Sequence, residues 1–354
     1  MSEQTGSVLA EENGSARSLI LNRPKSINAI DHEMVTEMAK LLDGWATDDA
    51  VAAVVLYGAG ERGLCAGGDI VAIHRDAAAL SGSPDATDLD AENSPSAKFW
   101  FDEYRLNAAI SRFPKKYVAI MDGIVMGGGV GVSAHGNTRV VTDRTRLAMP
   151  EVGIGFVPDV GGTHLLSRVP DGLGLYAGLT AAHLSGADAI AMGLADHYVP
   201  SESLPEFIEA IGSSGLDAAL GRFATEAPES KLAAQRGWIS EAFAAETVSE
   251  IIERCRAVGT EEATKTADTI AAKSPTALAV TLRSLREAAG DATLEDTLVR
   301  EYRVSLRCLL HPDMAEGIRA QVIDKDRNPS WAEFSEASVE KFFAPLPHDL
   351  TFDA

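Results

Sequence analysis

The sequence contains few residues of several kinds, and each shortage excludes a class of protein. Its three cysteines, Cys65, Cys255 and Cys308, show neither the pairing of a disulfide framework nor the spacing of a zinc site. No apolar run approaches the roughly 18–20 residues that a bilayer-spanning helix needs. Residues 1–6 lack the basic and apolar regions of a signal peptide. We therefore expect a cytoplasmic protein that holds no metal ion.

Positive charge is also scarce in this chain. There are 31 lysines and arginines against 52 aspartates and glutamates, which gives a formal net charge of −21. A surface of this kind repels nucleic acids and anionic membranes, so we expect neither as a partner. A small anionic ligand can bind only where backbone amides or a few basic side chains reverse the field locally.

The order of patterns along the chain predicts an α/β protein. Short apolar strands alternate with amphipathic helices in the first half, and the pattern is mostly helical from Gly172 onward. Asp31 is the expected N-cap of one early helix. We predict a core with the functional site over residues 1–200 and a helical region over 201–354. Residues 81–96 are rich in Ser, Asp and Pro and are predicted to form a surface loop. Strands are expected at 17–21, 51–57, 117–121, 139–142 and 146–149, and a helix at about 97–113.

Two glycine-rich loops share one construction, a buried strand followed by small residues and a helix start. The first contains Ala66, Gly67 and Gly68, and the second contains Gly127 and Gly128. Small residues let a ligand approach the backbone, and amides at a helix start carry positive partial charge. Two such amides converging on one oxygen would form an oxyanion hole. The alternative is that these glycines serve only tight turns and helix packing.

A third loop, residues 149–162, carries two carboxylates in an apolar setting. Glu151 and Asp159 stand at the two ends of its short apolar stretch. Burial raises a carboxyl pKa, and two neighbouring carboxylates separate each other's proton affinities, as acid–base chemistry requires. The alternative reading makes Asp159 the cap of a helix near Gly161 and Glu151 a solvated turn residue. Spacing alone does not decide between them.

Other short patterns indicate less. The series Gly129, Gly131 and Ala134 matches a dinucleotide fingerprint, but it lies in mid-chain without an acidic residue about 20 positions later. A nicotinamide oxidoreductase is therefore disfavoured. His32-Glu33 lacks the second histidine of a zinc helix, and Cys65 is expected to pack among small residues.

The two glycine loops and the loop at 149–162 resemble segments of the crotonase (enoyl-CoA hydratase/isomerase) superfamily. Within that superfamily the sequence resembles the 3-hydroxyisobutyryl-CoA hydrolase family most. The resemblance extends from about Ser18 to Trp331. It is carried by residues 21–29, 65–69, 102–107, 126–131, 149–162, 274–276, 301–303 and 324–331.

The resemblance implies a crotonase fold, a spiral of ββα repeats followed by a helical C-terminal region. It also implies an acyl-CoA substrate, with coenzyme A as part of that substrate and no separate cofactor. By match to the motifs, Gly68 and Gly128 would supply the oxyanion-hole amides. Glu151 and Asp159 would be catalytic. Residues expected to bind substrate are Glu103, Lys25, Ala66, Gly67 and Gly127.

The acidic residues favour a hydrolase over a hydratase within this superfamily. In the hydratase pattern a carboxylate closely follows the triple glycine, whereas this chain has Gly131 there and no acid over residues 127–137. Asp159 stands where hydratases typically have glycine. We therefore predict hydrolysis of a short β-hydroxyacyl-CoA thioester, with 3-hydroxyisobutyryl-CoA the preferred guess and valine breakdown the implied pathway.

Alternatives remain open at this point. They are an enoyl-CoA hydratase or isomerase, and a catalytically silent crotonase-fold protein that binds acyl-CoA. Glu151 could act as nucleophile or as general base. Thr163 and His164 depart from the family pattern, which leaves the acyl group undecided. Crotonase relatives are often trimers or hexamers, so a homo-oligomer is an expectation from the resemblance.

Overall fold

The structure, a computed structural model, describes residues 6–80 and 89–352. Contacts divide the chain into two units, each assembled from separate stretches and each described here by itself. The predicted division near residue 200 follows a different line and stays a prediction. The expectation for residues 1–5 and half of the loop predicted at 81–96 lie outside the described residues. Unit 1 comprises Met1–Gly68, Arg105–Ala148 and His183–Leu232, and unit 2 comprises Asp69–Tyr104, Met149–Ala182 and Ala233–Ala354.

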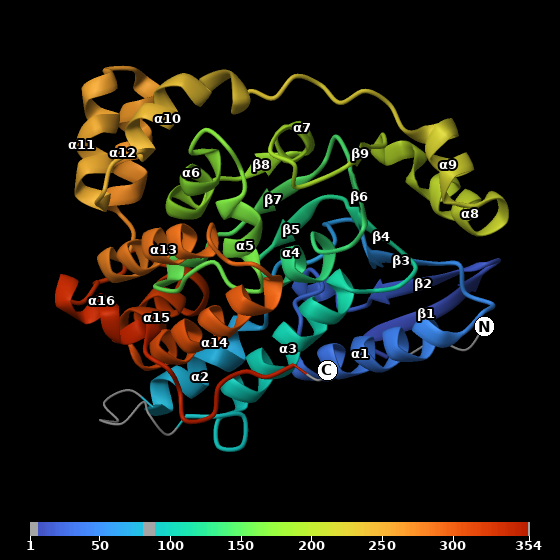
Figure 1. Cartoon of the computed structure of the whole chain (residues 1–354), viewed down its shortest axis with the longest axis horizontal. Helices are drawn as coiled ribbons and strands as arrows, with labels where there is room; N and C mark the ends of the chain where they lie inside the picture. The colour runs from blue at the N-terminus through green and yellow to red at the C-terminus, as the bar shows by residue number, and fades with distance from the viewer. Residues whose placement is uncertain (1–5, 81–88, 353–354) are drawn as a thin grey trace. The chain divides into compact units, whose positions relative to one another are not determined.

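Unit 1 is built on a sheet that is six-stranded in the described residues, with the order β1-β2-β3-β4-β6-β9. The first pair is antiparallel and the others are parallel. The middle strands are buried apolar runs, as expected for a sheet covered on both faces. Figure 1 shows these strands side by side. Their bounds are β1 Val8–Asn13, β2 Ala16–Leu21, β3 Ala53–Gly58, β4 Lys116–Met121, β6 Thr138–Val141 and β9 His197–Tyr198.

A second sheet in unit 1 has the order β5-β7-β8. Its strands are β5 (Ile124–Met126), β7 (Arg146–Ala148) and β8 (Leu184–Ser185). β5 follows β4 directly and β7 follows β6, so each strand pair contributes one member to each sheet. The helix α4 (Gly128–Ser133) follows the first pair, which is the predicted order of two strands and a helix.

The helices of unit 1 cover its large sheet. Asp31 caps α1 (His32–Thr47), as predicted, because its side chain accepts a hydrogen bond from the Met34 amide at 3.0 Å. The helices α8 (Leu204–Ser214) and α9 (Leu216–Phe223) share an apolar core with the sheet strands. The remaining short helices are η1 Pro24–Ser26, α7 Gly186–Ala191 and η4 Ser201–Ser203.

Unit 2 is helical in its described residues. A long helix, α3 (Pro95–Ser111), contributes its residues up to Tyr104 to this unit. The helix α14 (Leu294–Leu310) contacts α2, α5, α13, α15 and α16, and Figure 1 shows it among the C-terminal helices. The others are α2 Ile70–Leu80, η3 Glu151–Ile154, α5 Gly162–Ser167, α6 Leu173–Thr180, η5 Ala233–Gln235, α10 Arg236–Phe243, α11 Val248–Val258, α12 Glu261–Ala271, α13 Pro275–Ala288, α15 Pro312–Ile318, η6 Arg319–Ile323 and α16 Glu336–Phe343.

Aromatic rings pack α3 into unit 2. Trp100 stacks on Phe156 with ring centroids 5.4 Å apart. Tyr104 meets Tyr302 of α14 edge-on at 6.3 Å. Such contacts add to the apolar burial that holds α3 in place, and so they fix the part of the helix that carries Glu103 and Tyr104. None of the helices within the described residues has the length and apolar character to cross a membrane.

Candidate active site

The two predicted glycine loops lie side by side in unit 1. The Cys65 amide donates to the Ile124 carbonyl at 3.0 Å, and the Met126 amide donates to the Cys65 carbonyl at 3.0 Å. A Cβ atom on Gly129 would lie 2.8 Å from the Cys65 Cβ, so glycine is required for this approach. Cys65 is fully buried in this contact, and its expected packing among small residues is confirmed.

The hydrogen bonds of these loops leave three amides without an acceptor in the described residues, those of Gly68, Gly128 and Gly129. The amides of Ala66 and Gly127 donate to the Ile27 and Ala148 carbonyls, at 2.9 and 3.3 Å. Within the described part of the chain, no hydrogen bond occupies the amides of Gly68 or Gly128. Gly128 opens α4, where backbone N–H groups lack intrahelical partners. The two residues predicted to supply an oxyanion hole are therefore among the three with available donors.

The loop after β2 is locked against the first glycine loop by a buried asparagine. The Asn28 side-chain amide donates to the carbonyls of Ala59, Gly63 and Leu64 at 3.0, 3.2 and 3.1 Å. Asn28 also adopts a left-handed φ of 54°, which asparagine tolerates better than most residues. The predicted substrate-binding Lys25 lies in this loop with its side chain exposed.

The three predicted acids belong to unit 2 and are nearly excluded from water. Glu103 is 2% exposed, Glu151 is 6% and Asp159 is 5%. Glu151 is therefore not a solvated turn residue. Asp159 is not the side-chain cap of α5 either, because the N-cap position is Gly161 and no side chain caps it. The structure thus contradicts the solvated-turn and helix-cap alternatives, while a catalytic role for the two acids stays a prediction.

Asp159 differs from the other two acids in its hydrogen bonding. The Tyr104 hydroxyl donates to Asp159 Oδ2 at 2.8 Å. The same hydroxyl lies 2.7 Å from Ser305 Oγ on α14. By contrast, Glu103 Oε1 and Glu151 Oε2 are buried without a hydrogen-bond partner in the described residues. Such unpaired buried acceptors are costly and recur at functional sites.

Burial sets the proton affinities of the cluster. It raises the pKa of Asp159 to about 7, even though the Tyr104 hydrogen bond lowers it. Burial raises the pKa of Glu151 well above its usual range, and the charges on Asp159 and Glu301 raise it further. Burial and the Asp159 charge do the same to the pKa of Glu103. Acids shifted this far, with a neighbouring acid as partner, are typical of catalytic sites.

A fourth buried acid, Glu301 of α14, supports the turn after Asp159. It accepts hydrogen bonds from the Gly161 amide at 2.6 Å, the Thr163 amide at 3.0 Å and the Thr163 hydroxyl at 2.5 Å. Burial raises its pKa to about 8, although these three donors lower it. Val160 has a φ of 52°, which is strained for a β-branched residue. Glu301 thus fastens a strained turn that the rest of the chain must hold in place.

Sequence reasoning identified the acids Glu103, Glu151 and Asp159 but gave no role to Tyr104, Glu301 or Ser305. Tyr104 and Glu301 both lie in segments that carry the family resemblance, at 102–107 and 301–303. Their polar groups follow no spacing rule relative to Asp159, because 55 residues separate Tyr104 from it and 201 separate Tyr104 from Ser305. Only the fold brings them together.

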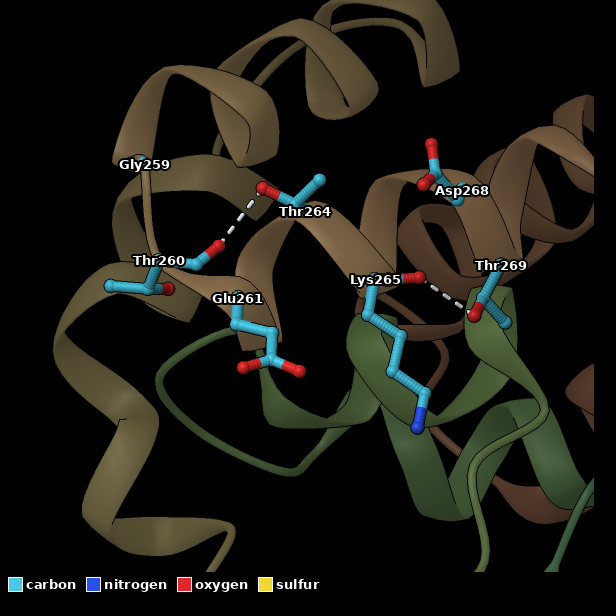
Figure 2. Close-up of a pocket in the computed structure, with 7 residues that line it drawn as sticks. All are labelled: Gly259, Thr260, Glu261, Thr264, Lys265, Asp268 and Thr269. Atoms are coloured by element: carbon cyan, nitrogen blue, oxygen red, sulfur yellow. Dashed lines mark hydrogen bonds between the residues drawn. The ribbon is translucent and has the colours of Figure 1, made fainter.

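A hollow in unit 2 lies apart from these acids in its lining. It runs along α12 and is lined by Gly259, Thr260, Glu261, Thr264, Lys265, Asp268 and Thr269, as Figure 2 shows. The Thr264 and Thr269 hydroxyls donate to the Thr260 and Lys265 carbonyls, and the Thr260 hydroxyl accepts a hydrogen bond from a backbone amide of α12, so all three are already occupied. In the part of the chain that the structure describes, no group of His, Cys, Asp and Glu could hold a metal ion.

Comparison with known proteins places this chain among the crotonases. The profile of the Enoyl-CoA hydratase/isomerase family matches residues 16–343. A protein from Danio rerio named 3-hydroxyisobutyryl-CoA hydrolase, mitochondrial, is 39% identical, covering 98% of this chain and 92% of the relative. The protein of the same name from Rattus norvegicus is 39% identical over 99% of this chain and 92% of its own length. In Arabidopsis thaliana, 3-hydroxyisobutyryl-CoA hydrolase 1 is 36% identical over 95% and 91%.

Two solved structures resemble the whole chain. The one described as a carnitinyl-CoA dehydratase from Mycobacterium thermoresistibile has a TM-score of 0.92 and 55% identity, with 99% of both chains covered. The one described as an enoyl-CoA hydratase from Rhodobacter sphaeroides 2.4.1 has a TM-score of 0.88 and 38% identity, over 98% of this chain and 100% of its own. The fold expected from the sequence is confirmed.

Proposed function

The chain belongs to the enoyl-CoA hydratase/isomerase family, and from that premise we propose that it hydrolyses a short β-hydroxyacyl-CoA thioester, most favourably 3-hydroxyisobutyryl-CoA. The observation that carries this proposal is the buried acid cluster in which Asp159, rather than a glycine, accompanies Glu151. The names of the curated relatives with 36–39% identity support the same substrate.

Thioester hydrolysis requires an electrophile activated by hydrogen bonds and an oxygen nucleophile. In our proposal the amides of Gly68 and Gly128 stabilise the negative oxygen of the tetrahedral intermediate, and both amides are free of other hydrogen bonds in the described residues. Glu151, as the carboxylate, attacks the carbonyl carbon and the C–S bond breaks, which leaves a mixed anhydride. Coenzyme A departs as the thiolate and becomes the thiol by taking up the proton that Glu151 gave up before the attack. Water then hydrolyses the anhydride and regenerates the Glu151 carboxylate.

Asp159 and Glu103 complete the polar part of the proposed site. Asp159 accepts a hydrogen bond from the substrate's 3-hydroxyl and helps to place the water. Glu151 reacts only as a carboxylate, yet burial raises its pKa well above the usual range. It must therefore lose a proton before it attacks, and Asp159, whose pKa is about 7, is the neighbouring acceptor. Glu103 contributes a further buried oxygen to the wall of this cluster.

The alternative is hydration of an enoyl thioester, which the descriptions of the two solved structures favour. Against it, the chain has no acid over residues 127–137, where the hydratase pattern places one of its two carboxylates. The deciding experiment offers the purified protein 3-hydroxyisobutyryl-CoA, 3-hydroxypropionyl-CoA and crotonyl-CoA in separate reactions. Free thiol and the enoyl absorbance are followed together. Thiol release from the hydroxyacyl esters supports hydrolysis, whereas loss of enoyl absorbance without thiol release rejects it.

Glu151 is the residue on which the proposed chemistry depends. Glu151→Gln should reduce kcat by at least about a thousandfold and leave binding of the CoA ester close to normal, because the amide keeps the shape but cannot attack. Single turnover of the wild type in oxygen-18 water then separates the two routes. Label in the Glu151 carboxylate supports attack through an anhydride, and label confined to the released acid supports general-base action on water. Near-normal turnover by Glu151→Gln would exclude both.

Other parts of the proposal follow from the sequence and the family. Coenzyme A is part of the substrate, and no further cofactor is required by the chemistry. Lys25, Ala66, Gly67 and Gly127 are proposed to line the path of the thioester. A cytoplasmic location and a homo-oligomeric state stay predictions, and the animal relatives compared above carry the word mitochondrial in their names.

A further inference from the structure

The buried acids of unit 2 raise the question of which one carries negative charge before substrate binds. Exposure does not distinguish Glu103, Glu151 and Asp159, since each is 6% exposed or less. Hydrogen bonding does distinguish them. Within the described residues, Asp159 is the one of the three that receives a hydrogen bond from another side chain, the Tyr104 hydroxyl at 2.8 Å. A hydrogen bond to a carboxylate favours its charged form.

The second contact of the Tyr104 hydroxyl gives this interaction a direction. Ser305 Oγ lies 2.7 Å from the same oxygen. A tyrosine hydroxyl has one proton, and Tyr104 donates it to Asp159, so Ser305 must be the donor in the other bond. Successive donations polarise each other and strengthen the final one. The chain of hydroxyls therefore runs from Ser305 through Tyr104 to Asp159.

The turn that follows Asp159 is held in place by α14, the helix that also carries Ser305. Glu301 lies one turn before Ser305 on α14, on the same helical face. It fastens the turn after Asp159 by accepting the Gly161 amide at 2.6 Å. The backbone that follows Asp159 therefore keeps its support from α14 when Tyr104 is changed.

We propose that Tyr104, oriented by Ser305, is a positioning residue that keeps Asp159 as the ionised acid of the unliganded cluster and leaves the proton on Glu151. What this charge then does rests on the proposed function: Asp159 is ready to accept the substrate hydroxyl, and the Glu151 proton must move before attack. The distribution of charge itself does not depend on which acyl group is cleaved.

The surroundings of Asp159 support this distribution. Burial raises the pKa of Tyr104 as well, and the Asp159 charge raises it further, so Tyr104 stays protonated and able to donate. Burial and the Asp159 charge also raise the pKa of the Cys308 thiol, which stays neutral. The titratable groups that face Asp159 are Glu103 and Tyr104 from α3, Glu151 from η3, and Glu301 and Cys308 from α14.

The experiment titrates Asp159 directly in the full-length protein. Carbon-13 NMR of protein labelled at the side-chain carboxyl carbons of aspartate and glutamate follows the ionisation of Asp159 and Glu151. Their signals are identified by their absence in Asp159→Asn and Glu151→Gln. Tyr104→Phe removes the donating hydroxyl and keeps the ring. Tyr302→Phe is the matched control, because Tyr302 is equally buried and its hydroxyl has no partner within the described residues.

We expect Tyr104→Phe to raise the pKa of Asp159 by at least about 1, because a hydrogen bond to a charged group stabilises the charged form by an amount that corresponds to such a change in pKa. Ser305→Ala should raise it by less, and Tyr302→Phe should leave it unchanged. With the acyl-CoA ester that the wild type cleaves fastest, Tyr104→Phe should lose kcat/KM at pH 6.5 and regain most of it at pH 9. A purely structural defect would not recover with pH.

Equal Asp159 pKa values in Tyr104→Phe and Tyr302→Phe would overturn the proposal, as would a wild-type titration in which Glu151 ionises before Asp159. If Tyr104→Phe fails to fold, Ser305→Ala decides alone, and an unchanged Asp159 pKa in that variant overturns the proposal. A wild type that releases no thiol from any ester rejects the proposed function, while the NMR titration still decides the charge distribution.

Discussion

Gly129→Ala should impair catalysis without touching any proposed catalytic atom. Gly129 is not one of the two proposed oxyanion donors, but its Cα faces the first glycine loop. An added Cβ would lie 2.8 Å from both the Cβ and the carbonyl oxygen of Cys65, whereas ordinary van der Waals contact begins at 3.4 Å. The second obstacle is backbone, so no rotamer change can relieve it. The two loops must therefore separate by about 0.6 Å.

The size of the effect follows from how strictly oxyanion donors must be placed. A displacement of about 1 Å in a catalytic group can cost on the order of a hundredfold in rate. Loss of one donor costs about a hundredfold to a thousandfold. A separation of about 0.6 Å between the loops that carry Gly68 and Gly128 should therefore lower kcat by about ten- to a hundredfold. The overpacking should also reduce stability by about 1–3 kcal/mol.

The assay is thiol release from the best acyl-CoA ester at a temperature well below the unfolding midpoint of both proteins. Gly44→Ala is the control, because Gly44 is an exposed interior residue of α1 with nothing within 4 Å of the added Cβ. That variant should keep wild-type kcat and gain up to about 1 kcal/mol in stability. If Gly129→Ala folds and its kcat stays within twofold of wild type, the glycine loops do not supply the oxyanion hole.

Two further predictions concern charge. Burial raises the pKa of Glu301 from 4.5 to about 8. Between these two values the folded state keeps a proton on Glu301 that the unfolded state releases. The contribution of Glu301 to the free energy of unfolding therefore falls as the pH rises from about 4.5 to 8. Glu301→Gln should therefore flatten the dependence of the unfolding midpoint on pH, and an unchanged slope would show that Glu301 does not titrate in this range. Lys25→Glu should raise KM for the CoA ester by roughly two- to fivefold at low salt, with less effect at high salt and no change in kcat. Lys40→Glu, on the exposed face of α1, is the control for the change in net charge. Equal KM values for the two variants would show that Lys25 does not contribute to binding of the CoA ester.

The local elements of unit 1 could be predicted from the sequence because their signals are local. Asp31 caps α1 as expected, and the five predicted strands lie within about two residues of their predicted bounds. The strands β1, β5, β8 and β9 were not predicted. The glycine loops could also be located, since a run of small residues after a strand has few other uses. What the sequence could not reveal was that these loops pair through Cys65, because that contact joins residues about 60 positions apart.

The candidate acids show the limit more sharply. Spacing left Glu151 compatible with a solvated turn and Asp159 with a helix cap. The burial of Glu151 and the cap position at Gly161 removed these alternatives. The contacts of α14 with the acid cluster could not be predicted for a different reason. Glu301 and Ser305 sit on a helix that reads as an ordinary amphipathic segment, and Val160 gives no warning in the sequence that it will adopt a left-handed φ. Strain and its compensation are properties of the folded chain.

The hydrogen bonds around Asp159 also limit which of the buried acids can carry a negative charge when the substrate binds. Burying an acid raises its pKa, so a cluster of nearly dry carboxylates would bind protons throughout if burial acted alone. The fold opposes this at one acid by directing a hydroxyl at Asp159 and at another by directing three donors at Glu301. Glu151 and Glu103 each keep a buried oxygen without a partner in the described residues. An incoming substrate therefore meets Asp159 already able to accept a hydrogen bond, and Glu151 in a form that reacts only after its proton leaves. The reactivity of Glu151 thus depends on occupation of the site.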